Sequence, residues 1–311
     1  MTFAGKRNTL ADCRYRGCLL AICLLMLVCA RSLPAQSPTP QPPPTVVFMT
    51  DFGVVDDSVA LCKGVMYGIV PNLRIVDLTH QVIAFSIADG ARFLFGASPY
   101  FPAGTVFVGV VDPTVGSTRK AIVVKTKRGQ FFVVPDNGLI TMVADRDGVE
   151  SSREITNPDW MIGAKVSSTF HGRDIFSPVG AHLARGDDWT QVGPELKQLV
   201  RLDLHPAVVD ERGLTGEVIA LDGPFGNLVT NISAEDFLRL GYQLGDSLKV
   251  TIAGREIEMP FVKTFSDVPL KQPLLYIDSR GRASFAVNQS SFAAAYNIQP
   301  PQPIFIPRKG H

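Results

Sequence analysis

The chain has 311 residues, which is enough for one large domain or two ordinary ones. Hydrophobic residues make up 46% of it, a share that excludes wholesale disorder. The first 35 residues hold five basic residues and one acidic residue, so without them the net charge changes from +1 to −3; neither value is typical of a protein that binds nucleic acid or an anionic membrane surface.

The N-terminus has the pattern of an export signal. A basic segment precedes the apolar run Cys18–Ala30, which at 13 residues suits a signal peptide and is too short for a comfortable membrane span. We predict that residues 1–35 are a signal peptide and that the mature protein is periplasmic or secreted, with no stable membrane span. The alternative is that this segment stays as an N-terminal membrane anchor. Residues 36–45 follow as a proline-rich spacer.

Strands alternate with helices in the first half of the chain. Apolar, β-branched runs predict strands over residues 45–51, 73–80 and 104–112, with helical patterns over 58–70 and 87–98 between them. This alternation indicates an N-terminal α/β domain, over residues 46–205, with a mostly parallel sheet covered by helices on both faces.

The pattern changes after about residue 200. From Leu214 onwards, short β-rich runs separated by glycine turns dominate, with one short helical pattern over residues 234–241. Closely spaced strands of this kind predict a small all-β, barrel-like domain over residues 212–308. We therefore expect a domain boundary at residues 200–213.

Ligands of parallel α/β sheets bind beyond the carboxyl ends of the strands. Three predicted strands carry ionisable residues there: Asp51, Asp77 with His80, and Asp112. The TDFG run around Asp51 is similar to the metal-binding motif of protein kinases, but no glycine-rich loop, strand lysine or catalytic loop precedes it. Asp51 is therefore interpreted either as a ligand-binding carboxylate or as an ordinary turn residue.

Two loops place ionisable residues next to glycine. Asp112 and Arg119 bracket the Pro/Gly loop of VDPTVGSTRK, and TFHGRDIF holds His171, Arg173 and Asp174 within four residues. Glycine lets a ligand approach the backbone closely. The alternative for Asp112 and Arg119 is a surface ion pair, which is worth under about 1 kcal/mol.

One segment of the predicted β domain has residues that suit a nucleoside. In PFGNLVTNIS, the ring of Phe225 can stack on a purine and the amide of Asn227 can pair with its edge. The alternative is a Gly-Asn turn between two strands. The run DSRGRASFAVNQ is interpreted from its residues as a hairpin with solvated arginines.

Taken in order, these segments resemble the S-adenosyl-L-methionine hydroxide adenosyltransferases, relatives of the fluorinase and chlorinase enzymes. The resemblance covers residues 45–307 and rests on TDFGVVDDSVALCKGVM, VDLTHQV, VDPTVGSTRKA, PDNGLIT, FHGRDIFSPVGAHLA, GPFGNLVTNI and DSRGRASFAVN. It implies an α/β domain followed by a β-barrel-like domain, assembled as a homotrimer with sites between subunits. It also implies cleavage of S-adenosylmethionine at the ribose C5′, with no metal and no cofactor.

The resemblance assigns the catalytic residues. Asp112, Arg119 and His171 match the residues that position water in the hydroxide enzymes, which form adenosine and methionine. Halogenases place a tyrosine where Asp112 stands and a serine where Gly172 stands, so the resemblance favours hydrolysis over halogenation. Gly172 would then leave room beside the water. The sequence leaves open which of Asp112 and His171 accepts the proton.

The resemblance also assigns substrate-binding residues. Asp51 would hold the ribose diol, and Phe85 would form an apolar wall. In the β domain the assigned residues are Asn227 for the adenine edge with Phe225 beside it, Asp222 for the methionine ammonium, and Ser279 and Arg280 for its carboxylate. One departure is Thr114, where most members have glycine; a positive φ at Thr114 would strain the loop.

Three other functions stay open from the sequence. One is a halogenase of the same family. The second is an exported protein that binds an adenosine-type ligand without turnover, since export leaves the supply of S-adenosylmethionine unexplained. The third is a metal-dependent hydrolase that uses Asp51, Asp56, Asp57 and His80, although no HExxH or Cys/His ligand spacing supports it.

Overall fold

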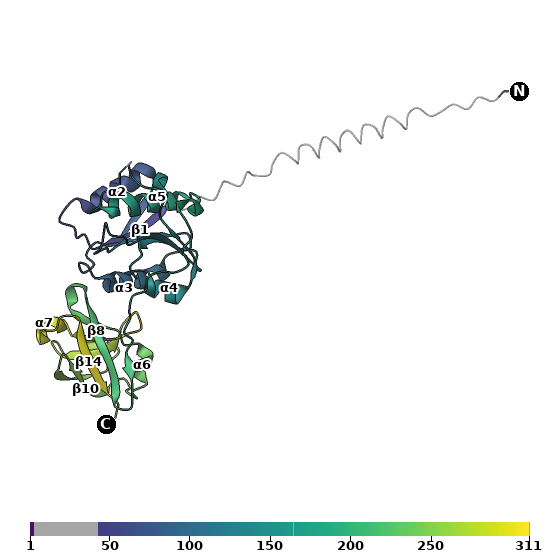
Figure 1. The fold of residues 1–311 in the computed structure, drawn as a ribbon. Coiled ribbons are helices and arrows are strands. Elements are labelled where there is room, and N and C mark those ends of the chain that lie inside the picture. Colours follow the sequence, from purple (N-terminus) through teal and green to yellow (C-terminus); the bar gives the residue numbers. More distant parts are fainter. Residues whose placement is uncertain (3–42, 164, 311) are drawn as a thin grey trace. The chain divides into compact units, whose positions relative to one another are not determined.

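The computed structural model describes residues 1–2, 43–163 and 165–310 (Figure 1). The predicted signal peptide, apart from its first two residues, and most of the predicted spacer lie outside the described residues. Within the described part of the chain, no helix is long and apolar enough to cross a membrane. Two β-sheets organise this part, one mostly parallel and one antiparallel.

The first sheet has six strands in the order β2-β1-β3-β5-β4-β6. They are β1 (Thr45–Thr50), β2 (Arg74–Thr79), β3 (Val106–Val110), β4 (Ala121–Thr126), β5 (Phe131–Pro135) and β6 (Val149–Glu154). β1 is parallel to β2 and β3, and β3 is parallel to β5, whereas β4 is antiparallel to both of its neighbours. The predicted, mostly parallel sheet is confirmed. The antiparallel strands at one edge were not predicted.

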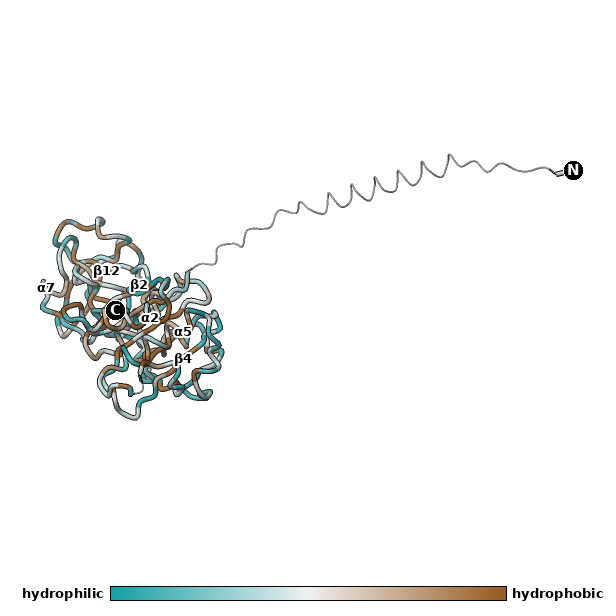
Figure 2. Tube along the Cα trace, turned by 90° about the horizontal axis from the view of Figure 1, so that it is seen from above, coloured by the Kyte–Doolittle hydropathy of each residue, from teal (hydrophilic) through white to brown (hydrophobic). Residues whose placement is uncertain are grey.

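Helices cover both faces of this sheet, as Figure 1 shows. On one face lie α2 (Ser58–Ile69) and α5 (Ser177–Arg185), and on the other lie α3 (Ile87–Ala97) and α4 (Thr141–Asp147). Because successive strand residues point to opposite faces, Val46 and Phe48 of β1 join the first core, and Val47 and Met49 join the second. A strand covered on both sides has a nearly continuous apolar run, as residues 46–49 of β1 show. In Figure 2 the trace of the α/β part is brown through much of its interior and teal in several outer loops.

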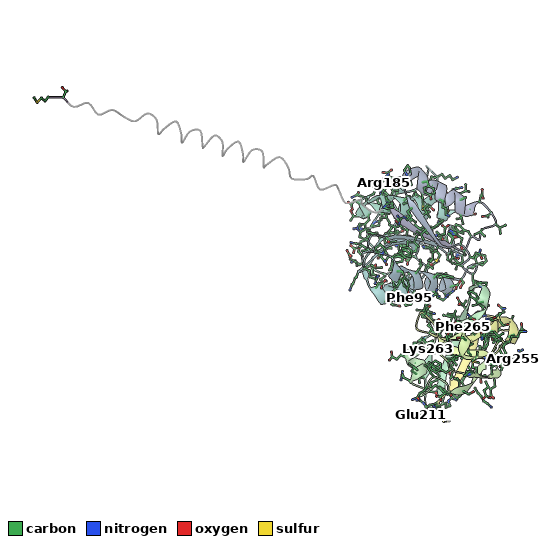
Figure 3. All side chains as sticks on the ribbon, turned by 180° about the vertical axis from the view of Figure 1, so that it is seen from behind. Phe95, Arg185, Glu211, Arg255, Lys263 and Phe265 are labelled. Carbon is green, nitrogen blue, oxygen red and sulfur yellow. The ribbon has the colours of Figure 1, made fainter. Side chains whose placement is uncertain are left out.

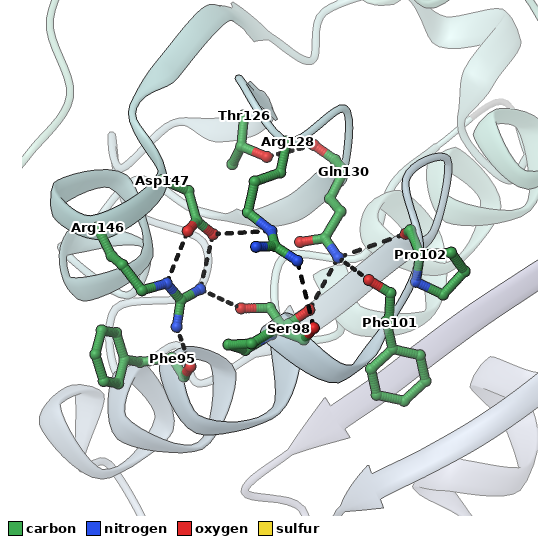
Figure 4. A network of polar contacts seen from close by, with 10 residues as sticks. Phe95, Ser98, Phe101, Pro102, Thr126, Arg128, Gln130, Arg146 and Asp147 are labelled. Atoms are coloured by element: carbon green, nitrogen blue, oxygen red, sulfur yellow. Dashed lines mark hydrogen bonds and ion pairs between the residues drawn. The ribbon is translucent and has the colours of Figure 1, made fainter. Parts of the chain in front are cut away.

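A network of hydrogen bonds lies at the amino ends of β3 and β5 (Figure 4). The buried Gln130 amide donates to the backbone oxygens of Ser98, Phe101 and Pro102 at 2.9, 2.7 and 3.4 Å. Arg146 adds a bond to Ser98 Oγ at 2.8 Å. These bonds fasten the loops that precede β3 and β5, at the end of the sheet opposite to the carboxyl ends where ligands bind.

The second sheet has eight strands, in the order β11-β10-β14-β8-β9-β13-β12, with β7 paired to β8. They are β7 (Val208–Val209), β8 (Gly213–Asp222), β9 (Asn227–Thr230), β10 (Ser247–Ile252), β11 (Arg255–Pro260), β12 (Pro273–Ile277), β13 (Ala283–Val287) and β14 (Gln302–Pro307). Neighbouring strands are antiparallel. A bridge from Phe261, just after β11, to Leu275 of β12 brings the two ends of the sheet together, so the predicted barrel-like architecture is confirmed.

Two short helices, α6 (Ala234–Leu238) and α7 (Phe292–Tyr296), accompany this barrel. The rings of Phe237, from α6, and Phe261 meet edge to face at 4.9 Å inside its core. The strands of the first sheet come from residues 45–154 and those of the barrel from residues 208–307. The division into two separate domains at residues 200–213 stays a prediction.

Candidate active site

Asp112 and Arg119 stand at the two ends of the loop that joins β3 to β4. Arg119 Nε donates to Asp112 Oδ1 at 3.0 Å, and Arg119 Nη2 contacts the other carboxylate oxygen. Only 4% of the Asp112 side chain and 7% of the Arg119 side chain are exposed. The two residues therefore form a bidentate buried pair, not the surface ion pair considered above, and removing one partner would leave an uncompensated buried charge.

Gly116 fits this loop against the segment that precedes His171. It has a φ of +81°, and a Cβ there would lie 2.2 Å from the Ser168 backbone oxygen. Any other residue would therefore require the backbone to shift. Thr114, the departure from the family pattern, is not among the residues with positive φ, so the strain considered for it is absent.

His171 immediately precedes a π-helical turn, Gly172–Phe176, a rare conformation that is frequent at functional sites. Its Nδ1 lies 3.2 Å from Nη2 of Arg119, 52 residues earlier in the chain. A guanidinium only donates, so Nδ1 accepts and the neutral ring carries its proton on Nε2. Burial, and then the charge of Arg119, lower the pKa of His171 from its ordinary value of 6.5. The imidazole is therefore neutral at neutral pH.

The buried side chain of Asp174 stabilises the same turn through hydrogen bonds. Its buried carboxylate accepts from the Ser167 backbone N–H at 2.8 Å and from Arg173 Nε at 2.6 Å. Burial alone would raise the pKa of Asp174, but these hydrogen bonds outweigh it and lower that pKa. The ionised carboxylate thus ties the segment before His171 to the turn after it.

Gly172 leaves room for the ring of Phe52. A Cβ on Gly172 would come within 2.8 Å of Phe52 Cζ. The Phe52 ring in turn meets the Phe170 ring edge to face, with centroids 5.9 Å apart. That Gly172 also leaves room beside a water molecule stays a prediction.

One cavity gathers the predicted residues of the α/β part. Its volume is about 240 Å³, and its lining includes Asp51, Phe85, Asp112, His171 and Gly172. Asp51 follows β1 and Asp112 follows β3, two neighbouring parallel strands. The cavity therefore lies beyond the carboxyl ends of the strands, where ligands of such sheets bind.

The predicted residues of the barrel line other cavities. Asp222, Phe225 and Asn227 line one of about 830 Å³, and Asp222, Ser279 and Arg280 line one of about 300 Å³. The Asn227 amide is buried and lies 3.5 Å from Asp222 Oδ2. The predicted site residues thus fall into two groups, one in the α/β part and one in the barrel.

Some neighbours of these groups carried no functional signal in the sequence. Phe265, labelled in Figure 3, lines both barrel cavities. Asn137 donates from Nδ2 to the backbone oxygen of Val111 at 2.9 Å and so holds the residue next to Asp112. Asn137 belongs to the PDNGLIT block, but no spacing rule connects it with Asp112. Its contact depends on the pairing of strands far apart in sequence.

Within residues 43–163 and 165–310, no three or more His, Cys, Asp or Glu side chains are grouped as a metal ion requires. In the set considered for a metal-dependent hydrolase, both ring nitrogens of His80 already have partners. Nδ1 lies 3.0 Å from Thr50 Oγ1, and Nε2 lies 3.1 Å from Asp77 Oδ1. His80 would have to give up one of these bonds to bind a metal.

Comparisons with known proteins give one consistent set of relatives. Residues 46–193 match the family model for the SAM hydroxide adenosyltransferase N-terminal domain, and residues 216–305 match that for the C-terminal domain. The chain is 40% identical over 264 residues to an (R)-S-adenosyl-L-methionine hydrolase of Salinispora tropica, which covers 83% of this chain and 96% of that protein. It is 33% identical over 283 residues to a fluorinase of Actinopolyspora mzabensis, with 82% and 94% covered. The crystal structure of a conserved protein from Thermotoga maritima superposes with a TM-score of 0.81 at 39% identity, over 84% of this chain and 99% of that one.

Proposed function

The chain belongs to the SAM hydroxide adenosyltransferase family, and we propose that it hydrolyses S-adenosyl-L-methionine to adenosine and L-methionine. One observation carries the proposal. Arg119 bonds to both Asp112 and His171, two residues that line one cavity with Asp51. A carboxylate and a neutral imidazole, both held by one guanidinium, suit the binding of a water molecule. The relatives named as S-adenosylmethionine hydrolases support the same reaction.

In this reaction the water oxygen attacks the ribose C5′ while the bond between C5′ and sulfur breaks. The electron pair of that bond stays on sulfur and leaves methionine as a neutral thioether. The sulfonium is already a good leaving group, so no acid is needed there. The water, by contrast, is a poor nucleophile and must be aligned and deprotonated. Catalysis by this chain is therefore mainly the positioning of one water.

The hydrogen bonds divide this task between two residues. His171 carries its proton on Nε2, because Arg119 occupies Nδ1, and so it donates to the water oxygen. Asp112 accepts a hydrogen bond from the water and takes its proton as the new bond to C5′ forms. Arg119 fixes the orientation of both side chains. The proton then passes to solvent.

The other predicted residues bind the parts of the substrate that lie away from the reacting atoms. Asp51 accepts from the ribose hydroxyls, and Phe85 supplies an apolar wall. The barrel residues that hold the adenine and methionine ends are Asp222, Phe225, Asn227, Ser279 and Arg280. This reaction draws on no metal and no cofactor.

We also propose a homotrimer with sites between subunits, as the resemblance to the family implies. Two features support it. The two groups of site residues line separate cavities, and the aromatic walls Phe85 and Phe225 are 73% and 66% exposed. Ligand sites bury most of the ligand surface, so walls this exposed call for a covering partner. Light scattering coupled to size exclusion tests this; full activity in a strictly monomeric sample would contradict it.

Export rests on the N-terminal sequence pattern alone, and we propose that the mature protein lacks residues 1–35. Mass spectrometry of the exported form should show this shortened chain. An intact Met1 would instead support the membrane anchor.

The test of the reaction incubates the purified protein with S-adenosylmethionine in ¹⁸O-labelled water, and identifies the products by mass spectrometry. Hydrolysis places one ¹⁸O atom in the 5′-hydroxyl group of adenosine. Parallel reactions contain chloride, fluoride or EDTA, and the adenosine yield should not change. Asp112→Asn should slow formation of the labelled product about 10² to 10⁴-fold, whereas the control Asp203→Asn, whose side chain is 90% exposed, should form it at the wild-type rate.

Each alternative has its own outcome in this test. A 5′-halo-adenosine as the main product would overturn hydrolysis in favour of halogenation, the second candidate that the fluorinase relative favours. Binding of the substrate without any product would support the exported binding protein. Loss of activity in EDTA would support the metal-dependent hydrolase.

A further inference from the structure

A chain of polar contacts lies at the carboxyl ends of β1 and β2, next to the candidate active site. His80 Nε2 lies 3.1 Å from Asp77 Oδ1, and His80 Nδ1 lies 3.0 Å from Thr50 Oγ1. The Phe52 backbone N–H donates to the same Thr50 oxygen at 3.2 Å. Thr50 and Phe52 are the two sequence neighbours of Asp51, so the chain of contacts ends on both sides of that residue.

The direction of each bond follows from the available donors. The Asp77 carboxylate only accepts, so His80 Nε2 carries a proton and donates it to Asp77 Oδ1. When the ring carries this proton alone, Nδ1 accepts from the Thr50 hydroxyl, whose oxygen also accepts from the Phe52 N–H. Lys63 Nζ donates to the other Asp77 oxygen at 2.7 Å. Burial alone would raise the pKa of Asp77, but the bonds from Lys63 and His80 outweigh it and lower that pKa.

These groups are costly to bury, which sets them apart from ordinary core residues. Thr50 and His80 are both buried, and the His80 ring meets the Phe48 ring edge to face at 5.0 Å. Apolar side chains of similar size would fill this space with no hydrogen bonds to satisfy. The polar pair therefore does more than fill the core, because it bonds Asp77 and the backbone next to Asp51.

Backbone contacts show where that role acts. Gly53 N–H donates to the His80 backbone oxygen at 2.7 Å, and Asp51 N–H donates to the Val110 oxygen at 3.3 Å. The hydroxyl of Thr50, the residue before Asp51, accepts from the N–H of Phe52, the residue after it. A short carboxylate has few rotatable bonds, so its position is set mainly by the backbone that carries it. Whatever fixes Thr50 and His80 therefore fixes the Asp51 carboxylate.

We propose that His80 and Thr50 are positioning residues for a ribose: through the contacts from Asp77 to Phe52, they hold the Asp51 carboxylate where a nucleoside diol meets it. The inference rests on the proposed function, in which Asp51 binds the ribose hydroxyls. Neither His80 nor Thr50 touches the substrate. Their effect should be confined to ligands that contain the ribose.

The test measures the Kd of adenosine and the Kd of methionine, by calorimetry, for a matched set of variants. Thr50→Val keeps the shape and removes the hydroxyl, whereas Thr50→Ser keeps the hydroxyl. We expect Thr50→Val to weaken adenosine binding about tenfold, the size of one lost hydrogen bond, and to leave methionine binding unchanged. Thr50→Ser should restore adenosine binding. The control is Thr126→Val, another buried threonine, whose hydroxyl donates to the Gln130 backbone at the opposite end of the sheet.

Several outcomes would overturn the inference. One is adenosine binding in folded Thr50→Val that equals the wild type. Another is an equal loss for adenosine and methionine, or the same loss in Thr126→Val, because either would indicate a general structural effect. If Thr50→Val fails to fold, Asp77→Ala replaces it. That side chain is 44% exposed, so its loss spares the core but frees His80 to change tautomer. Unchanged adenosine binding in Asp77→Ala would then reject the role.

The tautomer gives a readout that does not depend on ligand binding. Nitrogen-15 NMR of the wild type should show His80 protonated on Nε2 and bare on Nδ1, and a proton on Nδ1 would overturn the proposed direction of the contacts. If the wild type bound no adenosine, the proposed function would fail. The NMR result would still decide whether the contacts exist in solution.

Discussion

The Asp51 carboxylate holds the backbone of Phe85, a residue 34 positions later in the chain. Asp51 Oδ2 accepts from the Phe85 N–H at 3.0 Å. Phe85 has a φ of +68°, which residues other than glycine rarely adopt, and the residue is 73% exposed. Strain of this kind, next to a ligand cavity, indicates a residue kept for function and not for folding.

Substitutions of Phe85 should separate its effect on stability from its effect on substrate binding. Phe85→Gly relieves the positive φ, so we expect unchanged stability or a gain of up to about 1 kcal/mol. Phe85→Val places a β-branched residue in the same conformation and should lose about 1–3 kcal/mol. Both variants lose the aromatic wall and should raise KM for S-adenosylmethionine. Thermal unfolding and steady-state kinetics check this; a Phe85→Gly variant with normal KM would remove Phe85 from the site.

Asp112 and His171, which we propose to position one water, should act as one unit. A positioned general base contributes about 10² to 10⁴ in rate, so Asp112→Asn and His171→Ala should each lower kcat by about that range. The double variant should lose much less than the product of the two effects, because both residues serve one water. Single-turnover rates measure this, with melting temperatures as the control for folding. Normal turnover in His171→Ala would reject its catalytic role.

The pH dependence follows from the lowered pKa of His171. The neutral ring is required, so activity should be constant through neutral pH and fall only below the ordinary histidine value of 6.5. The free energy of unfolding should change with pH in the same direction as the activity. A group whose pKa is depressed in the folded state contributes stability above its unfolded pKa, and that contribution is lost as pH falls through the folded value. An acidic limb of kcat/KM centred above pH 7 would contradict this, as would the same limb persisting in His171→Gln.

Gly116 should be irreplaceable in the loop that carries Asp112. Gly116→Ala combines a positive φ with a contact of 2.2 Å to the Ser168 oxygen, so it should destabilise the protein by about 2–4 kcal/mol and lower kcat. The matched control is Gly64→Ala, within α2, where a new Cβ meets nothing within 4 Å. That change should instead stabilise the helix by about 1 kcal/mol. Chemical denaturation of both variants tests the pair, and equal effects would refute the argument.

The barrel residues should act on binding more than on chemistry. Asp222→Ala and Arg280→Ala remove groups proposed for the methionine end, away from C5′. KM should therefore rise while the single-turnover rate at saturation changes little. A loss confined to kcat would show that these residues do not hold methionine.

Much of the fold could be predicted because its strands have simple patterns. β1 and β3 are buried on both faces, so they appear in the sequence as continuous apolar runs that end in Asp51 and Asp112. β4 has a similar apolar run, but its antiparallel orientation could not be predicted from that run. β6 has the sequence VESSRE, which contains one apolar residue, and its pairing with β4 depends on contacts across the sheet.

The candidate site was only partly predictable for a similar reason. The residue types of Asp112, Arg119 and His171 stood out, but the contact between Arg119 and His171 joins two loops that are 52 residues apart. The positive φ of Phe85 is equally hidden, because a phenylalanine predicts no such conformation. Local patterns identified the groups, and only the folded chain gave the tautomer of His171.

The hydrogen-bond network of Gln130 and Arg146 has a consequence for how such a protein can change over evolutionary time. It secures the amino ends of β3 and β5, whereas the residues proposed for chemistry follow the carboxyl ends of β1 and β3. Substitutions among the residues proposed for chemistry therefore leave this anchoring intact. A sheet whose strands are held at their amino ends can change the nucleophile that is used at its carboxyl ends, and the chain still folds.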